Sequence, residues 1–176
     1  PKKFSLPNTS DDDSPWWIEI YLFDGVENMK EIQKVLVSEG LELSLVNPEF
    51  IPSDLVLQFG ATKALHAAST DSLKCHSVYS ELLYMLYPTS NMRQAFKTFG
   101  LLPKMKSVLV INYHCSSANE ASIRALVKGQ EKDISELPEY CDTDKIKKLY
   151  EISEPESKIS TLSQSIITRL IAKDFL

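Results

Sequence analysis

The strongest constraint on the fold is a continuous apolar run near the middle of the chain, residues 107–113 (SVLVINY). Its β-branched and aromatic residues predict a strand. A strand without alternating polar positions is typical of burial on both faces. The run therefore predicts a strand that lies in the interior of the molecule.

Strand and helix patterns alternate along the rest of the chain. Strands are predicted over 16–23 and 43–46 from their apolar residues and flanking turns. Helices are predicted where apolar residues recur at helical spacing or capping residues mark an end. The predicted helices span residues 28–39, 53–68, 78–86, 91–100, 119–128, 142–152 and 157–172. Segment 78–86 also fits a strand, and the helix is the favoured interpretation.

This interleaving predicts a single α/β domain, residues 16–176, in which helices pack on a small mixed β-sheet. Residues 1–15 are polar, include the acidic run 11–13, and are expected to form a flexible N-terminal lead. No repeat and no second domain is visible.

Two helices carry apolar stripes that are expected to face the core. In 53–68 the stripe consists of Leu55, Phe59, Ala64 and Leu65. In 157–172 it consists of Ile159, Leu162, Ile166 and Leu170. Amphipathic helices usually face their own core. The stripe of the last helix also suits an interface with another protein.

Charge is unevenly distributed over a chain whose formal net charge is −5. Residues 1–88 hold 6 basic and 13 acidic side chains, and residues 89–176 hold 13 basic and 11 acidic ones. An acidic protein has no global attraction for nucleic acid. Any RNA contact is therefore expected to use a local basic patch, and the second half, where basic residues outnumber acidic ones, is favoured.

The three cysteines, Cys75, Cys115 and Cys141, are odd in number and far apart in sequence. This pattern argues against a disulfide framework and against a Cys-rich zinc site. Reduced thiols in a cytosolic or nuclear protein are the simplest interpretation. No apolar run approaches the ~20 residues that a membrane helix needs, and no secretory signal is visible.

Motifs of catalysis are missing from the sequence. His66, His76 and His114 have no partner at metal-ligand spacing, so we expect packed or surface histidines, with no metal and no cofactor. Residues 60–63 (GATK) lack the upstream glycine of a phosphate-binding loop and lie inside a predicted helix. The sequence favours a binding or scaffold protein, and a small enzyme that uses Cys115 or His114 is the alternative.

The start of the predicted helix 91–100 combines polar groups with cations. Ser90 and Asn91 precede free backbone N–H groups, and Arg93 and Lys97 follow on the same helix. A helix N-terminus beside an arginine favours anions and phosphates. A plain capped helix explains the same residues without any ligand.

Several blocks of the chain, in order and at matching spacing from about residue 16 to residue 176, resemble the TPRKB family. They are 45–48 (LVNP), 60–66 (GATKALH), 87–100 (YPTSNMRQAFKTFG), 137–139 (LPE), 146–150 (IKKLY) and 167–174 (ITRLIAKD). The resemblance implies a small α/β fold with no active site of its own. It also implies the kinase-binding small subunit of the KEOPS (EKC) complex.

The resemblance further implies the partners of the chain. The family binds the N-lobe of a kinase-like ATPase subunit (PRPK/Bud-type) and meets the other KEOPS subunits through it. The assembled complex makes threonylcarbamoyladenosine on tRNA, and the small subunit also binds the single-stranded CCA end of the tRNA. A scaffold without an RNA role is a third interpretation, and it would show no salt-dependent tRNA binding.

For the kinase contact, the last helix is expected to supply Ile166, Arg169, Leu170 and Lys173, because interfaces favour apolar anchors with arginine nearby. The substitution Leu170→Glu is then expected to abolish kinase binding without unfolding the protein.

For the tRNA contact, basic and polar groups are expected to form the groove that single strands occupy. The expected residues are Lys63, Ser90, Asn91, Arg93 and Lys97. The family's archaeal-type glycine and arginine are missing from the loop 89–92, and Arg93 lies one step into the helix. No stacking ring is nominated.

Overall fold

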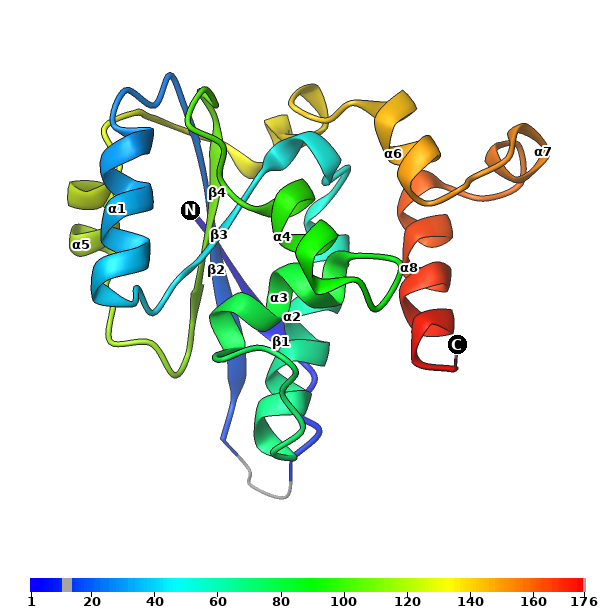
Figure 1. The fold of residues 1–176 in the computed structure, drawn as a ribbon, viewed down its shortest axis with the longest axis horizontal. Coiled ribbons are helices and arrows are strands. Elements are labelled where there is room, and N and C mark those ends of the chain that lie inside the picture. Colours follow the sequence, from blue (N-terminus) through cyan, green and yellow to red (C-terminus); the bar gives the residue numbers. More distant parts are fainter. Residues whose placement is uncertain (11–13, 176) are drawn as a thin grey trace.

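The computed structural model describes residues 1–10 and 14–175 (Figure 1). They form a single α/β domain around one sheet, as the sequence predicts. The strands are β1 (Lys2–Leu6), β2 (Trp16–Asp24), β3 (Ser44–Val46), β4 (Val108–Tyr113) and β5 (Gln130–Lys132). Their order is β1-β2-β4-β3, and β5 pairs with the end of β2. All of these pairings are antiparallel, which refines the mixed sheet expected from the sequence.

The central position of β4 confirms the prediction made from its apolar run. All six of its residues are buried, and it pairs with β2 on one side and β3 on the other. Successive side chains of a strand point to opposite faces. Ile111 therefore packs on one face of the sheet and Val110 on the other, each in its own hydrophobic cluster.

Helices cover both faces of the sheet, and Figure 1 shows α1 and α5 on one side with α2, α3, α4 and α8 on the other. The helices are α1 (Met29–Glu39), α2 (Asp54–Ser69), α3 (Val78–Leu86), α4 (Met92–Phe99), α5 (Glu120–Leu126), α6 (Thr143–Leu149), α7 (Glu154–Ser157) and α8 (Leu162–Ala172). Three short 3₁₀ turns are η1 (Pro48–Phe50), η2 (Ile134–Glu139) and η3 (Lys173–Phe175). No helix among these residues is long and apolar enough to cross a membrane.

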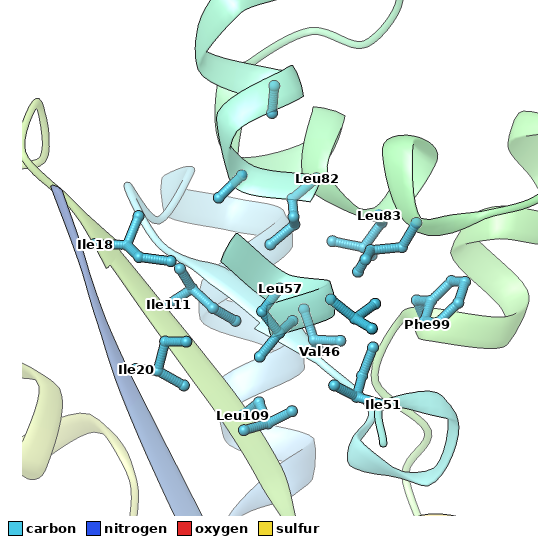
Figure 2. Packing of buried hydrophobic residues seen from close by; sticks show 14 of the residues in the cluster. Ile18, Ile20, Val46, Ile51, Leu57, Leu82, Leu83, Phe99, Leu109 and Ile111 are labelled. Carbon is cyan, nitrogen blue, oxygen red and sulfur yellow. The ribbon is translucent and has the colours of Figure 1, made fainter. Parts of the chain in front are cut away.

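The larger cluster fills the space between the sheet and α2, α3 and α8. Figure 2 shows Ile18, Ile20 and Ile111 of the sheet facing Leu57 and Leu82 of the helices. A smaller cluster lies under α1 and α5 on the other face. Helices α2 and α3 approach closely at Gly60, where a Cβ atom would lie 3.0 Å from the Leu82 and Leu86 side chains. The segment 60–63 is thus part of a packed helix, as the sequence predicts, and does not form a phosphate-binding loop.

The N-terminal segment differs from the flexible lead that the sequence predicts. Lys2–Leu6 forms the edge strand β1, which pairs with β2 from Trp16 to Ile20. Leu6 is buried and Phe4 packs against the larger cluster. The hydrogen-bonding edge of β2 therefore orders a segment whose own composition gave no strand signal. The acidic run 11–13 lies outside the described residues.

The C-terminal helix predicted over 157–172 begins five residues later than expected, and its predicted first residue is instead the last residue of α7. Helix α7 ends at Ser157, and α8 begins at Leu162 after a new capping box, in which Thr161 and Gln164 bond each other's backbone N–H. Such a cap starts a helix instead of continuing one. Ile159 lies in the connection and is 88% exposed, so it is not part of the buried stripe.

A second predicted orientation is also wrong. Leu55 lies in the first turn of α2 and is exposed, whereas the adjacent Val56 and Leu57 are fully buried. The buried face of α2 is turned toward the sheet and α3, and Leu55 points away from both.

Helices α5 and α6 also end earlier than predicted, at Leu126 and Leu149. The ambiguous segment 78–86 is helix α3, and its Ser77–Ser80 capping box explains its start.

Candidate functional site

A cavity of about 730 Å³ opens on the helical face of the sheet, beside α2 and the loop before α3. Its lining combines cations, hydroxyl groups and two aromatic rings. The basic side chains are Lys63, His66, Lys74 and Lys173; the hydroxyl residues are Thr9, Thr62, Ser72 and Ser90; the rings are Phe59 and Tyr84. No Asp or Glu of the described chain lines the cavity. The described lining of the cavity is therefore basic, although the protein as a whole is acidic.

Two of the cations are fixed by contacts with neighbouring helices. The Lys63 ammonium donates to the Leu170 carbonyl oxygen of α8 at 2.9 Å. The Lys173 ammonium donates to the Tyr84 carbonyl oxygen at 2.6 Å and lies 3.5 Å from the centre of the Tyr84 ring. Helices α2, α3 and α8 are thereby joined by the same groups that give the cavity its charge.

Lys74 is held differently, through the backbone of its loop. The Glu81 carboxylate is fully buried, and it accepts the backbone N–H groups of Lys74 at 3.0 Å and Cys75 at 2.6 Å. The loop is anchored by these bonds while the Lys74 side chain remains exposed at the cavity. Thr9, from the segment after β1, closes another side of the cavity with its hydroxyl 2.8 Å from His66 Nδ1.

Helix α4 begins at the edge of this cavity. Ser90 lines it, and the Asn91 side chain accepts the Gln94 N–H at 3.1 Å, which confirms Asn91 as the cap. Arg93 and Lys97 are exposed on α4, outside the lining. Of the five residues predicted to contact RNA, the fold brings Lys63 and Ser90 into one cavity. Arg93 and Lys97 lie on the adjoining helix α4, and Asn91 is its cap.

The structure adds lining residues that the sequence analysis did not identify, above all Phe59, His66, Lys74 and Tyr84. Phe59 and His66 lie on different turns of α2, and Lys74 and Tyr84 come from the loop before α3 and from α3 itself, so no single segment of the sequence contains all four. Lys173 was expected at a kinase interface and lies instead in the cavity wall. Only the packing of α2, α3 and α8 brings these side chains together.

The side chains predicted for kinase binding are largely used within the domain. Ile166 and Leu170 are fully buried in the core, and Lys173 is only 7% exposed. The Arg169 guanidinium holds both oxygens of Glu156 at 2.7 Å and also donates to the Tyr150 carbonyl oxygen. The expected spare apolar surface is therefore not on the Ile166–Leu170 side of α8. The exposed large apolar side chains on α2, on α8 and at the chain end after α8 are Leu55, Ile171 and Phe175.

The residues of the enzyme alternative lack the features of an activated nucleophile. Burial is the main factor that raises the pKa of all three cysteine thiols. It raises the pKa values of Cys115 and Cys141, and it raises the pKa of Cys75 to about 12. A catalytic thiolate requires a lowered pKa. His114 stacks on Trp16, with ring centres 6.3 Å apart. Within residues 1–10 and 14–175, no group of three His, Cys, Asp or Glu side chains is arranged to hold a metal ion.

The domain thus combines a cationic cavity with thiols whose pKa values are raised, an arrangement that suits binding of an anionic partner. A family model described as "Kinase binding protein CGI-121" matches residues 23–174. The chain is 34% identical over 155 residues to the EKC/KEOPS complex subunit TPRKB of Danio rerio, covering 87% of this chain and 89% of that protein. It is 27% identical over 176 residues to the EKC/KEOPS complex subunit CGI121 of Candida glabrata, covering 96% of each.

These matches cover almost the whole domain, from β2 to the end of α8. The chain belongs to the CGI-121 family of kinase binding proteins. It is thus a non-catalytic, kinase-binding protein, as the resemblance found in its sequence blocks implies.

Proposed function

We propose that this protein is a subunit of an EKC/KEOPS complex that binds the kinase-like ATPase subunit and holds the 3′ CCA end of tRNA in the cationic cavity. Relatives that span nearly the same length are named as subunits of that complex. The observation that carries the RNA part is the lining of the cavity, which combines Lys63, Lys74 and Lys173 with aromatic rings. Proteins that bind single strands combine these same two features.

Phe59 is the ring best placed to stack on a base. One face of the Tyr84 ring is covered by the Lys173 ammonium, whereas the Lys63 ammonium lies 5.9 Å from the centre of the Phe59 ring. Phe59 is partly exposed at the cavity. A cavity of about 730 Å³ also lies within the usual range for small-ligand sites, about 300–1,000 Å³. A terminal nucleotide would thus stack on Phe59 with its phosphates near Lys63 and Lys74.

The test of the cavity uses a short single-stranded RNA that ends in CCA. The substitutions Lys74→Gln and Phe59→Leu are expected to weaken its binding, because one removes a phosphate partner and the other a stacking face. Lys148→Gln on α6 is the matched control, since Lys148 is also exposed and lies outside the cavity lining. Equal affinity of all three variants and the unchanged protein would exclude the cavity as the RNA site.

For the kinase contact we propose the outer face of α8 with the start of α2. The two helices run side by side, with Ser53 bonded to Ser163 near their first turns and Lys63 bonded to Leu170 near their later turns. Leu55, Ile171 and Phe175 are the exposed apolar side chains along these helices. The buried core of a protein interface is more apolar than its rim. Helix α8 is therefore the proposed kinase-binding element, as the sequence predicts. The proposed contact uses its exposed face, whereas the sequence predicts the face that carries Ile166 and Leu170.

Co-purification with the kinase-like subunit tests this face. Ile171→Glu is expected to abolish the complex and leave the fold intact, because Ile171 is 47% exposed. Leu102→Glu is the control, since Leu102 is 46% exposed and lies in the loop between α4 and β4. If the Ile171→Glu protein is folded and still binds the kinase as well as the control does, the placement is wrong.

A further inference from the structure

The longest stretch of the chain without an acidic residue lies between Glu81 and Glu120. It carries four cations, Arg93, Lys97, Lys104 and Lys106, and all four are exposed. In the described part of the chain, no carboxylate forms an ion pair with any of them. A protein of net charge −5 therefore has one segment in which exposed positive charge is concentrated and no ion pair is formed among the described residues.

The first two of these cations lead away from the cavity along α4. Arg93 and Lys97 are one helical turn apart on the same face, about 6 Å along the axis at 1.5 Å per residue. Ser90, which lines the cavity, is two residues before the helix begins at Met92. The charges on α4 therefore begin three residues after a residue of the cavity lining.

The second pair continues the surface on the loop that follows α4. This loop is held in place by two hydrogen bonds. The Gln33 side chain of α1 donates to the Leu101 carbonyl oxygen at 2.7 Å. The Val26 backbone N–H donates to the Lys106 carbonyl oxygen at 2.8 Å. Leu101 and Met105 pack into the smaller hydrophobic cluster. With these two side chains turned inward, Lys104 and Lys106 are left at the surface of a fixed loop.

Resting on the proposed binding of the tRNA end in the cavity, we propose that Arg93, Lys97, Lys104 and Lys106 form a basic track that binds the phosphate backbone of the tRNA acceptor arm. The continuity of the track with the cavity favours RNA over other anionic partners, since an RNA whose end is held in the cavity must leave along the adjoining surface. Contacts to phosphates position a nucleic acid and do not read its sequence. The track would therefore serve any tRNA, and it would add affinity that the CCA end alone lacks.

Two ligands separate the track from the cavity: whole tRNA and a short single strand ending in CCA. The double variants R93Q/K97Q and K104Q/K106Q are expected to bind whole tRNA several-fold more weakly. The slope of log affinity against log salt should also decrease by about 0.7–0.9 for each phosphate that the variant no longer neutralises. Their affinity for the short strand should remain that of the unchanged protein. K148Q/K158Q removes the same charge from exposed positions on α6 and after α7, and it should leave whole-tRNA binding intact.

The proposal is overturned if both track variants bind whole tRNA as the unchanged protein does, or if the control variant loses as much affinity as they do. It is also overturned if the track variants lose binding to vesicles that contain phosphatidylserine and keep their affinity for tRNA. The cavity is judged separately, by the effect of Lys74→Gln on the short strand. Failure of the proposed function and failure of the track therefore give different results.

Discussion

The Lys173 ammonium lies over the Tyr84 ring and donates to the Tyr84 carbonyl oxygen, so a nearly buried cation retains two favourable partners. A buried charge is tolerated only when such partners replace water. Arg169 follows the same rule, with a bidentate pair to Glu156 and a bond to the Tyr150 carbonyl oxygen. At the residue scale, the cations of the C-terminal region thus fix α8 to the body of the domain.

The fully buried Leu170 gives the first prediction at this scale. Leu170→Ala is expected to lower the free energy of unfolding by about 2–5 kcal/mol, because it leaves a cavity in the core. Leu170→Glu should unfold the protein, in contrast to the folded, binding-deficient variant that the sequence predicts. Chemical denaturation checks both, with Ile171→Ala at the next, exposed position as the control. A native-like Leu170→Glu protein would contradict the burial.

The Glu156–Arg169 pair gives a prediction about pH. The hydrogen bond from Arg169 is the main factor that lowers the pKa of Glu156, and the Ser165 hydroxyl adds to it. A folded-state pKa below the unfolded value of about 4.3 stabilises the fold above that pH, and the contribution is lost as pH falls through the folded-state pKa. Glu156→Gln should therefore lower Tm at pH 7, and the difference from the unchanged protein should shrink below about pH 4. A difference that is constant from neutral to acidic pH would contradict the pairing.

At the scale of elements, capping decides where the C-terminal helices begin. The apolar spacing of 157–172 fits one helix, but Thr161 and Gln164 form a capping box that starts α8 at Leu162. Helix α4 shows the opposite case, because its cap, Asn91, lies where the sequence pattern predicts it. A cap inside an otherwise periodic segment therefore outweighs the periodicity.

The capping box of α8 can be tested by substitution. Thr161→Ala is expected to lower the free energy of unfolding by about 1 kcal/mol, since the N–H of Gln164 loses its acceptor. Thr161→Ser retains the hydroxyl and should restore most of this stability. Denaturant midpoints of the three proteins provide the comparison. Equal stability of the alanine and serine variants would show that the box contributes nothing.

At the scale of the whole molecule, the cavity is a product of how α2, the loop before α3, α3 itself and the end of α8 pack together. Its basic side chains come from α2 (Lys63 and His66), from the loop before α3 (Lys74) and from the distant C-terminal end (Lys173). A ligand that binds there contacts several elements at once and binds only the folded chain. Such a ligand stabilises the fold by mass action.

A CCA-ending single strand is accordingly expected to raise the Tm of the protein. At 100 times its Kd the gain in unfolding free energy is about 2.7 kcal/mol. The gain at a fixed RNA concentration should decline as salt is added, because phosphate contacts release counterions. Thermal melts with and without the RNA at two salt concentrations measure both effects. An RNA that binds and leaves Tm unchanged would indicate a site outside the folded domain.

The amino-acid sequence by itself determined the α/β class, the interior strand β4, most of the helices and, through its family blocks, the membership in a kinase-binding family. These features depend on local properties: side-chain periodicity, the cap at Asn91, and short runs of residues in a fixed order. Tertiary structure alone decided that Lys2–Leu6 becomes an edge strand, that Leu55 faces solvent, and that Ile166 and Leu170 are buried. It also decided that Lys63, Lys74 and Lys173 share one cavity. The physical reason is that the burial of a side chain, and the convergence of several side chains on one cavity, depend on which faces of distant elements meet. A pattern within one element shows that a face is apolar or basic. It does not show which other element covers that face.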